Sequence, residues 1–237
     1  MNEIADVSKP EPLDFGSTDY LDSYSRINGM VIVGEGLADR HFRRLAALFP
    51  EDSEELLRLG AMEARHAKDF VGCGKNLGVK ANSALAHKLL KPLHSQFSEA
   101  EDKGDLVSCL VIQCIIIECF AVAAYRTYLP VADNYAKSIT QLVLEDEFEH
   151  LNYGECWLRS RFNQVANGVE HCINLAVPVA MNLLDVLKPD LEMIGMDPKE
   201  LITEFIVCFE DSLQKVGFIR KDAQRIIRKL LVTQLTA

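Results

Sequence analysis

The sequence lacks any pair of cysteines separated by two residues, although it contains seven cysteines. Such pairs are typical of structural zinc sites and thiolate-bound iron. The cysteines are odd in number, and several lie in apolar runs. We therefore expect reduced, buried thiols in a cytoplasmic protein rather than a disulfide framework. The seven positions are Cys73, Cys109, Cys114, Cys119, Cys156, Cys172 and Cys208.

Basic residues are scarce. Lys and Arg number 25 against 35 Asp and Glu, which gives a formal net charge of −10. Because the phosphates of nucleic acids attract positive charge, this balance argues against a nucleic-acid partner. The chain is 237 residues long and 49% apolar, so it can bury a sizeable core.

The N-terminus lacks the basic segment and apolar segment of a signal peptide. Residues 1–17 are acidic and contain prolines, and we expect a loose arm there. No linker or low-complexity segment follows, so residues 18–237 are predicted to form a single domain. One run, LVSCLVIQCIIIECFAVAAY at 106–125, is long enough to span a membrane. It contains Glu118, and we interpret it as a buried helix in a protein without a transmembrane segment.

No stretch keeps the two-residue alternation of a β-strand, whereas apolar spacing near 3.6 residues recurs along the chain. The fold is predicted to be all-α. Pro92 and Pro178 fall inside predicted helices and should kink or split them. Pro, Gly, Asn and Asp signals place helices near 18–49, 52–77, 82–103, 105–129, 133–166, 168–188, 198–217 and 219–235.

The hexapeptide EDEFEH at 145–150 puts four carboxylates and one histidine directly after the apolar run ITQLVL. Successive side chains of an α-helix turn by about 100°. Glu147 and His150 therefore share the face of Val143 and project toward the core. Glu145 and Glu149 point away and should be solvated, and Asp146 lies at the edge of the buried face.

The same Glu-x-x-His spacing occurs at Glu63 and His66, on a face that also carries leucines. Two further carboxylates, Glu35 and Glu118, lie on apolar helix faces. A lone buried glutamate is costly unless it is protonated or paired. An ion pair with an arginine such as Arg65 is the simplest structural explanation for either of them, and a satisfied core histidine is the simplest for each Glu-x-x-His.

Taken together, the positions form a repeated half-motif. Glu35 precedes the first Glu-x-x-His by 28 residues, and Glu118 precedes the second by 29. Four carboxylates and two imidazoles pointing into one helical bundle are the ligand set of ferritin-like di-iron and di-manganese proteins. Two divalent cations would offset the four negative charges. The sequence therefore predicts a ferritin-like four-helix bundle with about eight helices in total.

The ligand chemistry favours iron or manganese over structural zinc, and iron is our first choice. Two adjacent metals can bind and reduce dioxygen between them. From the residues alone, the chain is an oxygen-activating di-iron enzyme with an apolar substrate, or a ferritin-like iron-storage or peroxide-scavenging protein. Apolar and small residues flank the ligands and either line a pocket or simply pack the core: Phe70, Val111, Ile115, Phe120, Ala121 and Val122.

Four segments resemble the aldehyde-deformylating oxygenases of cyanobacteria, also called aldehyde decarbonylases: YSRIN, EARHAKDFVGCGKNL, IQCIIIECFAVAAYRTYLPVAD and DEFEHLNYGECWL. The resemblance implies conversion of a long-chain fatty aldehyde and dioxygen to formate and an alkane one carbon shorter. It also implies ferredoxin and its NADPH-dependent reductase as electron donors. An acyl-carrier-protein reductase would make the aldehyde.

The resemblance includes all six proposed ligands of two iron ions: Glu35, Glu63, His66, Glu118, Glu147 and His150. Tyr125 lies seven residues after Glu118, two turns along the same face, where it can donate a hydrogen bond near the metals or act as an ordinary core tyrosine. Gln113, Arg65 and Asp146 match family positions around the site and are candidates for orienting the ligands. A plain solvated or packing role is the alternative for each of them. Cys73 also matches a family position, and a buried structural thiol is the alternative interpretation of this residue. Phe42 departs from the family, because a tyrosine is expected there in some members.

The C-terminal segment IRKDAQRIIRKLL is basic in an acidic chain. Its isoleucines and leucines fit a packed terminal helix with a solvated basic face. A helix that binds a partner or a membrane surface is the alternative.

Overall fold

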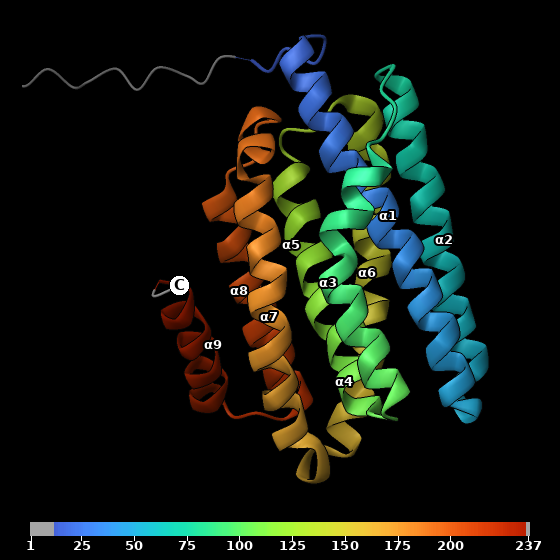
Figure 1. Ribbon diagram of the computed structural model, residues 1–237, viewed down its shortest axis with the longest axis vertical. Coiled ribbons are helices and arrows are strands. Elements are labelled where there is room, and N and C mark those ends of the chain that lie inside the picture. Colours follow the sequence, from blue (N-terminus) through green and yellow to red (C-terminus); the bar gives the residue numbers. More distant parts are fainter. Residues whose placement is uncertain (1–11, 236–237) are drawn as a thin grey trace, which may run out of the picture.

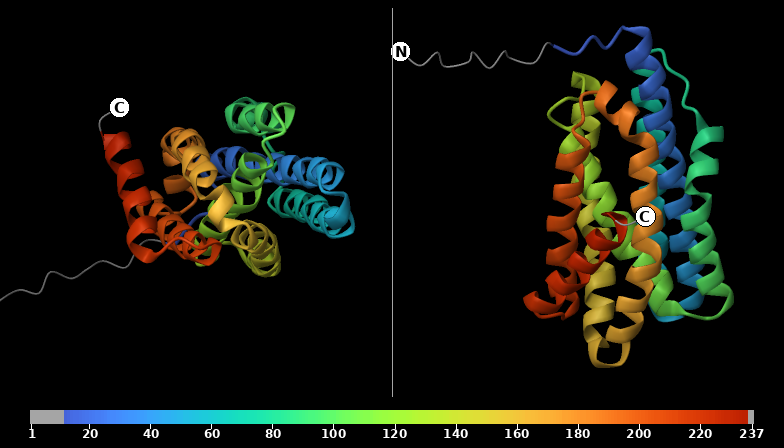
Figure 2. Two further views of the ribbon diagram at one scale, coloured as in Figure 1. Left: turned by 90° about the horizontal axis from the view of Figure 1, so that it is seen from below. Right: turned by 60° about the vertical axis from the view of Figure 1, so that its left-hand side comes forward.

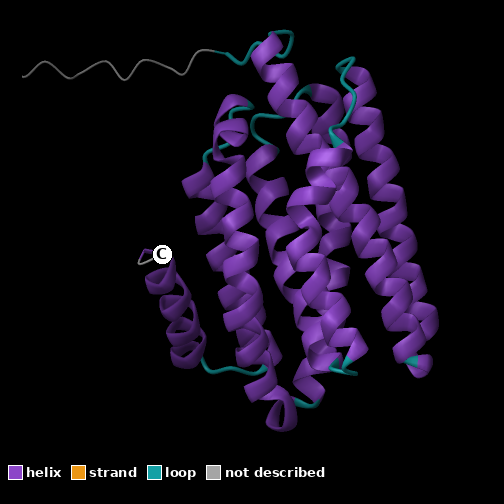
Figure 3. Ribbon diagram, viewed as in Figure 1, coloured by secondary structure: helices purple, strands orange, loops and turns teal. Residues whose placement is uncertain are grey.

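The computed structural model describes residues 12–235, and of residues 231–235 only the backbone. All regular structure in this part of the chain is helical (Figure 3). The elements are α1 (Thr18–Leu48), the 3₁₀ turn η1 (Pro50–Asp52), α2 (Ser53–Asn76), α3 (Ser83–Asp102), α4 (Leu106–Leu110), the π-helix η2 (Val111–Ile117), α5 (Glu118–Tyr128), α6 (Asn134–Ser160), α7 (Phe162–Met193), α8 (Pro198–Val216) and α9 (Arg220–Leu235).

Since α4, η2 and α5 follow one another without a break, they form one continuous helix. The described chain thus contains eight long helices, which confirms the all-α prediction and the expected number. The long helices run roughly side by side, and α9 lies at one side of the bundle (Figures 1 and 2). This continuous helix, called the central helix below, contacts α1, α6, α7 and α8, so it is surrounded on most sides.

Side-chain caps explain several helix starts. The Ser17 side chain accepts a hydrogen bond from the backbone N–H of Tyr20 at the start of α1. Asp133 accepts from the first backbone N–H groups of α6, and Asp197 does the same for α8. These side chains satisfy donors that a helix start leaves without partners. They stand next to the starts that the sequence predicts.

The predicted break near residue 167 is wrong. The chain instead turns at Arg161, between α6 and α7, and Gly168 lies inside α7. The Arg161 guanidinium lies 4.1 Å from the centre of the Trp157 ring and donates to the Trp157 carbonyl. Ser160 donates to the same carbonyl, so side chains satisfy an acceptor that the helix end leaves free.

The prolines do not split their helices. α3 continues through Pro92, and α7 continues through Pro178 and also through Pro189, which was expected to lie beyond its end. Leu93 and Val177, the neighbours of Pro92 and Pro178, are buried in the core. Burial of such side chains, at about 1.5–3 kcal/mol each, offsets much of the roughly 3 kcal/mol that an internal proline costs.

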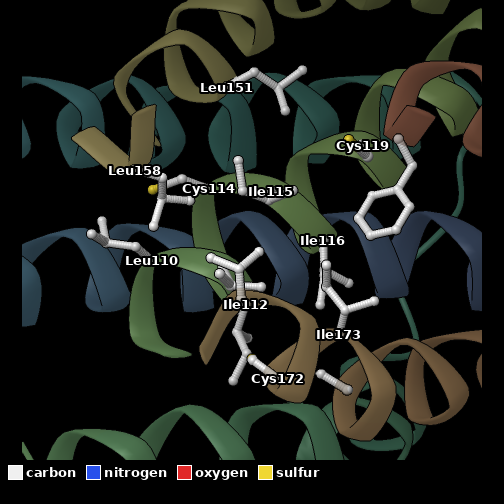
Figure 4. Packing of buried hydrophobic residues seen from close by; sticks show 14 of the residues in the cluster. Leu110, Ile112, Cys114, Ile115, Ile116, Cys119, Leu151, Leu158, Cys172 and Ile173 are labelled. Atoms are coloured by element: carbon white, nitrogen blue, oxygen red, sulfur yellow. The ribbon is translucent and has the colours of Figure 1, made fainter. Parts of the chain in front are cut away.

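The apolar run at 106–125 is a core helix, as expected. Leu106–Tyr128 and Phe162–Met193 are both long and apolar enough to cross a membrane by length and composition, but 72% of the first window is buried inside the protein. Figure 4 shows Leu110, Ile112, Cys114, Ile115 and Ile116 packed among Leu151, Leu158 and Ile173. The second window is 39% buried.

All seven cysteines, which lie within the described residues, are free thiols, and six of them are buried. Cys156 is exposed, so the expectation of buried thiols is wrong at this position. The residue lies on the outer side of α6, beside a surface hollow that contains Asn152 and Arg159. Burial raises the pKa of the Cys73 thiol to about 12, which favours the interpretation of Cys73 as an inert packing residue.

The two ends of the chain pack differently. Ala223, Ile226, Ile227 and Leu230 of α9 are buried in the main core, and Arg220 and Lys221 are exposed. The basic terminal helix is therefore packed, with a solvated basic face. Residues 1–11 of the predicted arm lie outside the described residues. From residues 12–17, Phe15 packs edge-on against Tyr20.

Gly154 marks the closest approach of α6 to the central helix. A Cβ at this position would overlap the Cβ of Cys114. Gly154→Ala is therefore expected to lower the free energy of unfolding by about 1–3 kcal/mol, because the helices must move apart. The measurement is urea denaturation of the metal-free protein. Gly36→Ala is the matched control, since within the described residues a Cβ there meets nothing within 4 Å. It should stabilise by about 0.5–1 kcal/mol; equal effects of the two changes would contradict the tight contact.

Candidate metal centre

The six predicted ligands converge inside the bundle. α1 supplies Glu35, α2 supplies Glu63 and His66, α5 supplies Glu118, and α6 supplies Glu147 and His150. All six side chains are buried, and Glu35 is the most exposed of them at 6%. The inward direction that helical periodicity predicted for these side chains is therefore confirmed. Glu145 and Glu149 are exposed, also as predicted.

The ligand atoms form two overlapping groups. One contains Glu35 and His66, the other contains Glu118 and His150, and Glu63 and Glu147 belong to both. Within each group the candidate atoms lie within 4.8 Å of one another. Each group thus offers three carboxylates and one imidazole, and the two groups are joined by two shared carboxylates. This arrangement is suited to two metal ions held side by side.

Both histidines turn Nδ1 toward the carboxylates. His150 Nδ1 lies 2.9 Å from Glu147 Oε2, and His66 Nδ1 lies 3.3 Å from Glu63 Oε2. Across residues 12–235, the buried side-chain oxygens that have no hydrogen-bond partner include Glu63 Oε1 and Glu147 Oε1. His150 Nδ1 lies 3.2 Å from Glu63 Oε1 and His66 Nδ1 lies 3.4 Å from Glu147 Oε1, but neither contact is a hydrogen bond. A buried polar atom without a hydrogen bond is costly, and both atoms belong to the shared carboxylates. The donor set and these unpaired oxygens fit bound cations.

Crowding of buried charge shifts the pKa values strongly. Burial and the nearby Glu147 carboxylate raise the pKa of Glu63 well above its usual range and that of Glu118 to about 8. Burial opposes a charged imidazole at His66 and His150, but hydrogen bonds to neighbouring glutamates outweigh it. The pKa of His66 rises to about 11 and that of His150 to about 10. In the metal-free protein, protons thus occupy positions that cations would take.

These pKa values predict a metal affinity that rises with pH. Metal ligation requires a neutral imidazole and an ionised carboxylate, so binding must displace protons from His66, His150 and the raised carboxyl groups. Affinity should increase by about tenfold per pH unit for each proton displaced. Competition titrations of Co²⁺ against a chelator of known pH dependence, at pH 6, 7 and 8, measure this. An affinity that does not change with pH would show that the ligands are not protonated in the metal-free protein.

Asp146 links the centre to the surface of α2. Its Oδ2 lies 3.0 Å from His66 Nε2, and Arg65 forms an ion pair with the same oxygen. Arg65 therefore does not neutralise Glu35 or Glu118, and the simple ion-pair explanation for those glutamates is wrong. A carboxylate bonded to the second ring nitrogen fixes the orientation of a ligating histidine.

Tyr125 is buried and donates a hydrogen bond to Glu35 Oε1. Its ring stacks on Phe70, with ring centres 5.4 Å apart. Burial and the Glu35 carboxylate raise the pKa of the phenol well above its usual range, so it stays a donor. Phe42, where the family resemblance suggested a tyrosine, is fully buried and lies 5.3 Å from the His150 ring. It packs against the centre without a hydroxyl contact.

Gln113 reaches Glu118 because the helix between them is wound as a π-helix. Its Nε2 donates to Glu118 Oε1 at 2.7 Å, across five residues of sequence. Single π-helical turns occur frequently at functional sites. Two histidines that the sequence analysis missed, His41 and His94, continue from Gln113 in a chain of hydrogen bonds. Neither belongs to a spaced motif, so only the three-dimensional contacts reveal them.

An apolar cavity of about 210 Å³ adjoins the carboxylates. Glu35, Glu63, Glu118 and Glu147 form one part of its wall. Phe120 and Ala121 line it, whereas the other flanking residues singled out from the sequence, such as Val111 and Val122, pack in the core. The remaining wall comes from α1, α3, α5, α7 and α8 through Met30, Val31, Gly34, Leu37, Ala38, His41, Leu90, Leu93, His94, Ala124, Tyr125, Ala180, Leu183, Leu184, Leu187 and Leu201, with Ile117 from η2.

Comparison with known proteins places this architecture in a family. Residues 17–232 match the family model described as long-chain fatty aldehyde decarbonylase. The chain belongs to this family. The structure is also similar to that of a protein from Synechococcus with aldehyde deformylating oxidase activity, with a TM-score of 0.91 and 51% sequence identity. The match covers 92% of this chain and 100% of the other. Membership of the decarbonylase family confirms the resemblance seen in the sequence.

Proposed function

We propose that the protein converts long-chain fatty aldehydes to formate and alkanes one carbon shorter, with dioxygen as co-substrate. The observation that carries the proposal is an apolar cavity whose wall includes all four buried glutamates, in a chain of the aldehyde decarbonylase family. An alkyl chain fits apolar walls, and its carbonyl end would lie beside the carboxylates. Iron storage, the alternative from the sequence, needs no such cavity, and both comparisons favour the enzyme.

We assign the six buried side chains as ligands of two iron ions. Glu63 and Glu147 belong to both ligand groups, which supports a bridging role for them. Glu35 and Glu118 would each bind one metal together with a histidine. When bound, the metal pair would supply the binding and reduction of dioxygen. Iron is preferred because carboxylate-rich sites with two imidazoles suit it.

The chain's own residues hold and shield this chemistry. Tyr125 fixes Glu35, Gln113 fixes Glu118, and Asp146 with Arg65 fixes His66. The apolar wall excludes water from the aldehyde, which strengthens electrostatic interactions in the site. For each aldehyde, one dioxygen, four electrons and three protons yield one alkane, one formate ion and one water. The side chains around the site do not supply these electrons, so an external donor is required, and we propose ferredoxin with its NADPH-dependent reductase. An acyl-carrier-protein reductase is the proposed source of the aldehyde.

The direct test is a turnover assay. Protein loaded anaerobically with Fe²⁺ receives octadecanal, a reducing system and then oxygen. We expect heptadecane and formate in equal amounts, measured by gas chromatography and by a formate assay. Iron accumulation in a cage-sized assembly without heptadecane would overturn the proposal in favour of storage.

Ala121 tests whether the cavity holds the alkyl chain. Ala121→Phe fills part of the cavity, so turnover of octadecanal should fall by about tenfold or more while a short aldehyde such as heptanal is affected less. The measurement is the ratio of kcat/KM for the two substrates. The matched control is Ala123→Val, which overpacks a fully buried position outside the cavity wall. It should lower thermal stability without changing the ratio; a stable Ala121→Phe variant with an unchanged ratio would remove Ala121 from the substrate site.

A further inference from the structure

Four side chains connect the protein surface to the metal centre in one line. His94 Nδ1 lies 2.8 Å from His41 Nε2, and His41 Nδ1 lies 2.6 Å from Gln113 Oε1. Gln113 Nε2 donates in turn to Glu118 Oε1. His94 is partly exposed, whereas His41, Gln113 and Glu118 are buried. The line begins near the solvent and ends on a proposed ligand.

The donors and acceptors in this line can be assigned from its inner end. Because Gln113 turns its N–H toward Glu118, it presents its carbonyl oxygen to His41. His41 must therefore carry its proton on Nδ1. Burial lowers the pKa of His41 to about 3, so the ring is neutral and its Nε2 is an acceptor. His94 must then donate from Nδ1, which both its charged form and one neutral tautomer can do.

Packing holds the middle of the line in place. The His41 ring stacks on Phe97, with centres 3.8 Å apart and planes 11° from parallel. It also lies nearly parallel to the His94 ring, at 5.0 Å. Stacking restrains rotation of the His41 ring, while the hydrogen bonds define which nitrogen faces Gln113.

We propose that His94 and His41 are positioning residues, which hold the Gln113 amide with its N–H toward Glu118 and so orient one ligand of the metal centre. Without the His41 donor, the amide can flip and present its oxygen to the carboxylate, which repels it. Outer partners of this kind tune both the geometry and the affinity of a metal site. The inference rests on the proposed dinuclear site. It assigns a role at that site to two residues that the sequence analysis did not place there.

Two replacements of His94 separate donation from packing. His94→Asn places an amide N–H near the position of Nδ1 and keeps the chain, whereas His94→Leu fills similar space without a donor. We expect the Leu variant to weaken Co²⁺ binding by about three- to tenfold, less than the roughly 10- to 100-fold typical of partners bonded directly to a ligand. It should also shift the visible absorption of the Co²⁺-loaded protein. The Asn variant should remain within about twofold of the parent protein on the same scale.

The control is His87→Leu, an exposed histidine on the same helix, which should change neither affinity nor absorption. A second variant, His41→Asn, keeps an amide N–H near the position of Nδ1, but its shorter side chain has no acceptor at the position of Nε2, which faces His94. Adding His94→Leu to it should therefore have no further effect. Equal affinities and spectra for the Leu and Asn variants of His94, or additive effects in the double variant, would overturn the proposal.

Kinetics with the Fe²⁺-loaded enzyme give an independent readout. His94 also lines the cavity, and loss of a cavity contact would change KM for octadecanal. Loss of positioning would lower kcat with little change in KM. The metal titration and the spectrum need no aldehyde turnover. They therefore test the hydrogen-bonded line from His94 to Glu118 even if the proposed reaction fails.

Discussion

His150→Ala is expected to lower the aldehyde-dependent activity by at least about 100-fold and to leave the protein with close to one tightly bound metal ion. His150 Nδ1 faces Glu63, Glu118 and Glu147, and the side chain is fully buried. Its loss opens a coordination position inside the protein, an effect larger than the roughly 10- to 100-fold of an outer partner. Iron content per chain and the octadecanal assay measure both consequences.

The matched control for this change is His171→Ala, which replaces an exposed histidine on α7. It should retain two metal ions and full activity. A parent protein that binds only one iron per chain, or a fully active His150→Ala enzyme, would contradict the dinuclear assignment.

Removal of metal is expected to loosen residues 144–154 of α6. Glu145 and Glu149 lie four residues apart, where like charges repel by about 0.2–0.5 kcal/mol. Glu147 loses its cation, and Asn152 and Gly154 weaken the helix interior. Ion pairs of Arg58 with Glu149 and of Arg65 with Asp146 offset only part of this charge at exposed positions.

Hydrogen exchange on metal-free and iron-loaded protein measures the effect. A metal present at about 1,000 times its Kd stabilises the native state by about 4 kcal/mol, so exchange of these amides can slow by up to about 1,000-fold. Leu106–Tyr128 is the internal control, because its apolar surroundings hold it without metal. Equal protection of residues 144–154 in both forms would show that packing alone holds this part of α6.

Sequence periodicity was sufficient to predict that the six proposed ligands are buried and converge, because the physical cost of burying charge is high. A glutamate on an apolar helix face needs a partner, and two such glutamates with two Glu-x-x-His pairs left few solutions. The position of each ligand follows from about 100° of rotation per residue, which long helices preserve.

The misses have a different origin. The end of α6 depends on Arg161, which stacks on Trp157 four residues earlier and donates to its carbonyl. This local side-chain contact is not one of the Pro, Gly, Asn or Asp signals from which the break was predicted. The prolines of α7 are tolerated because neighbouring residues are buried, which local propensity does not include. His41 and His94 come from different helices and meet only in the folded chain. The shape of the cavity likewise depends on residues of α1, α3, α7 and α8 together.

The π-helix Val111–Ile117 changes the direction in which the side chains of the central helix point on either side of it. In an α-helix, five residues turn by about 500°, which would put Gln113 about 140° away from Glu118. A π turn closes between residues i and i+5, so both side chains return to one side. The wider turn therefore changes how α5 is rotated about the helix axis relative to α4. Before it, α4 packs on α3 and α7; after it, α5 packs on α6 and α8. The central helix thereby presents two differently rotated apolar faces, and the proposed ligand Glu118 lies where one face ends and the other begins.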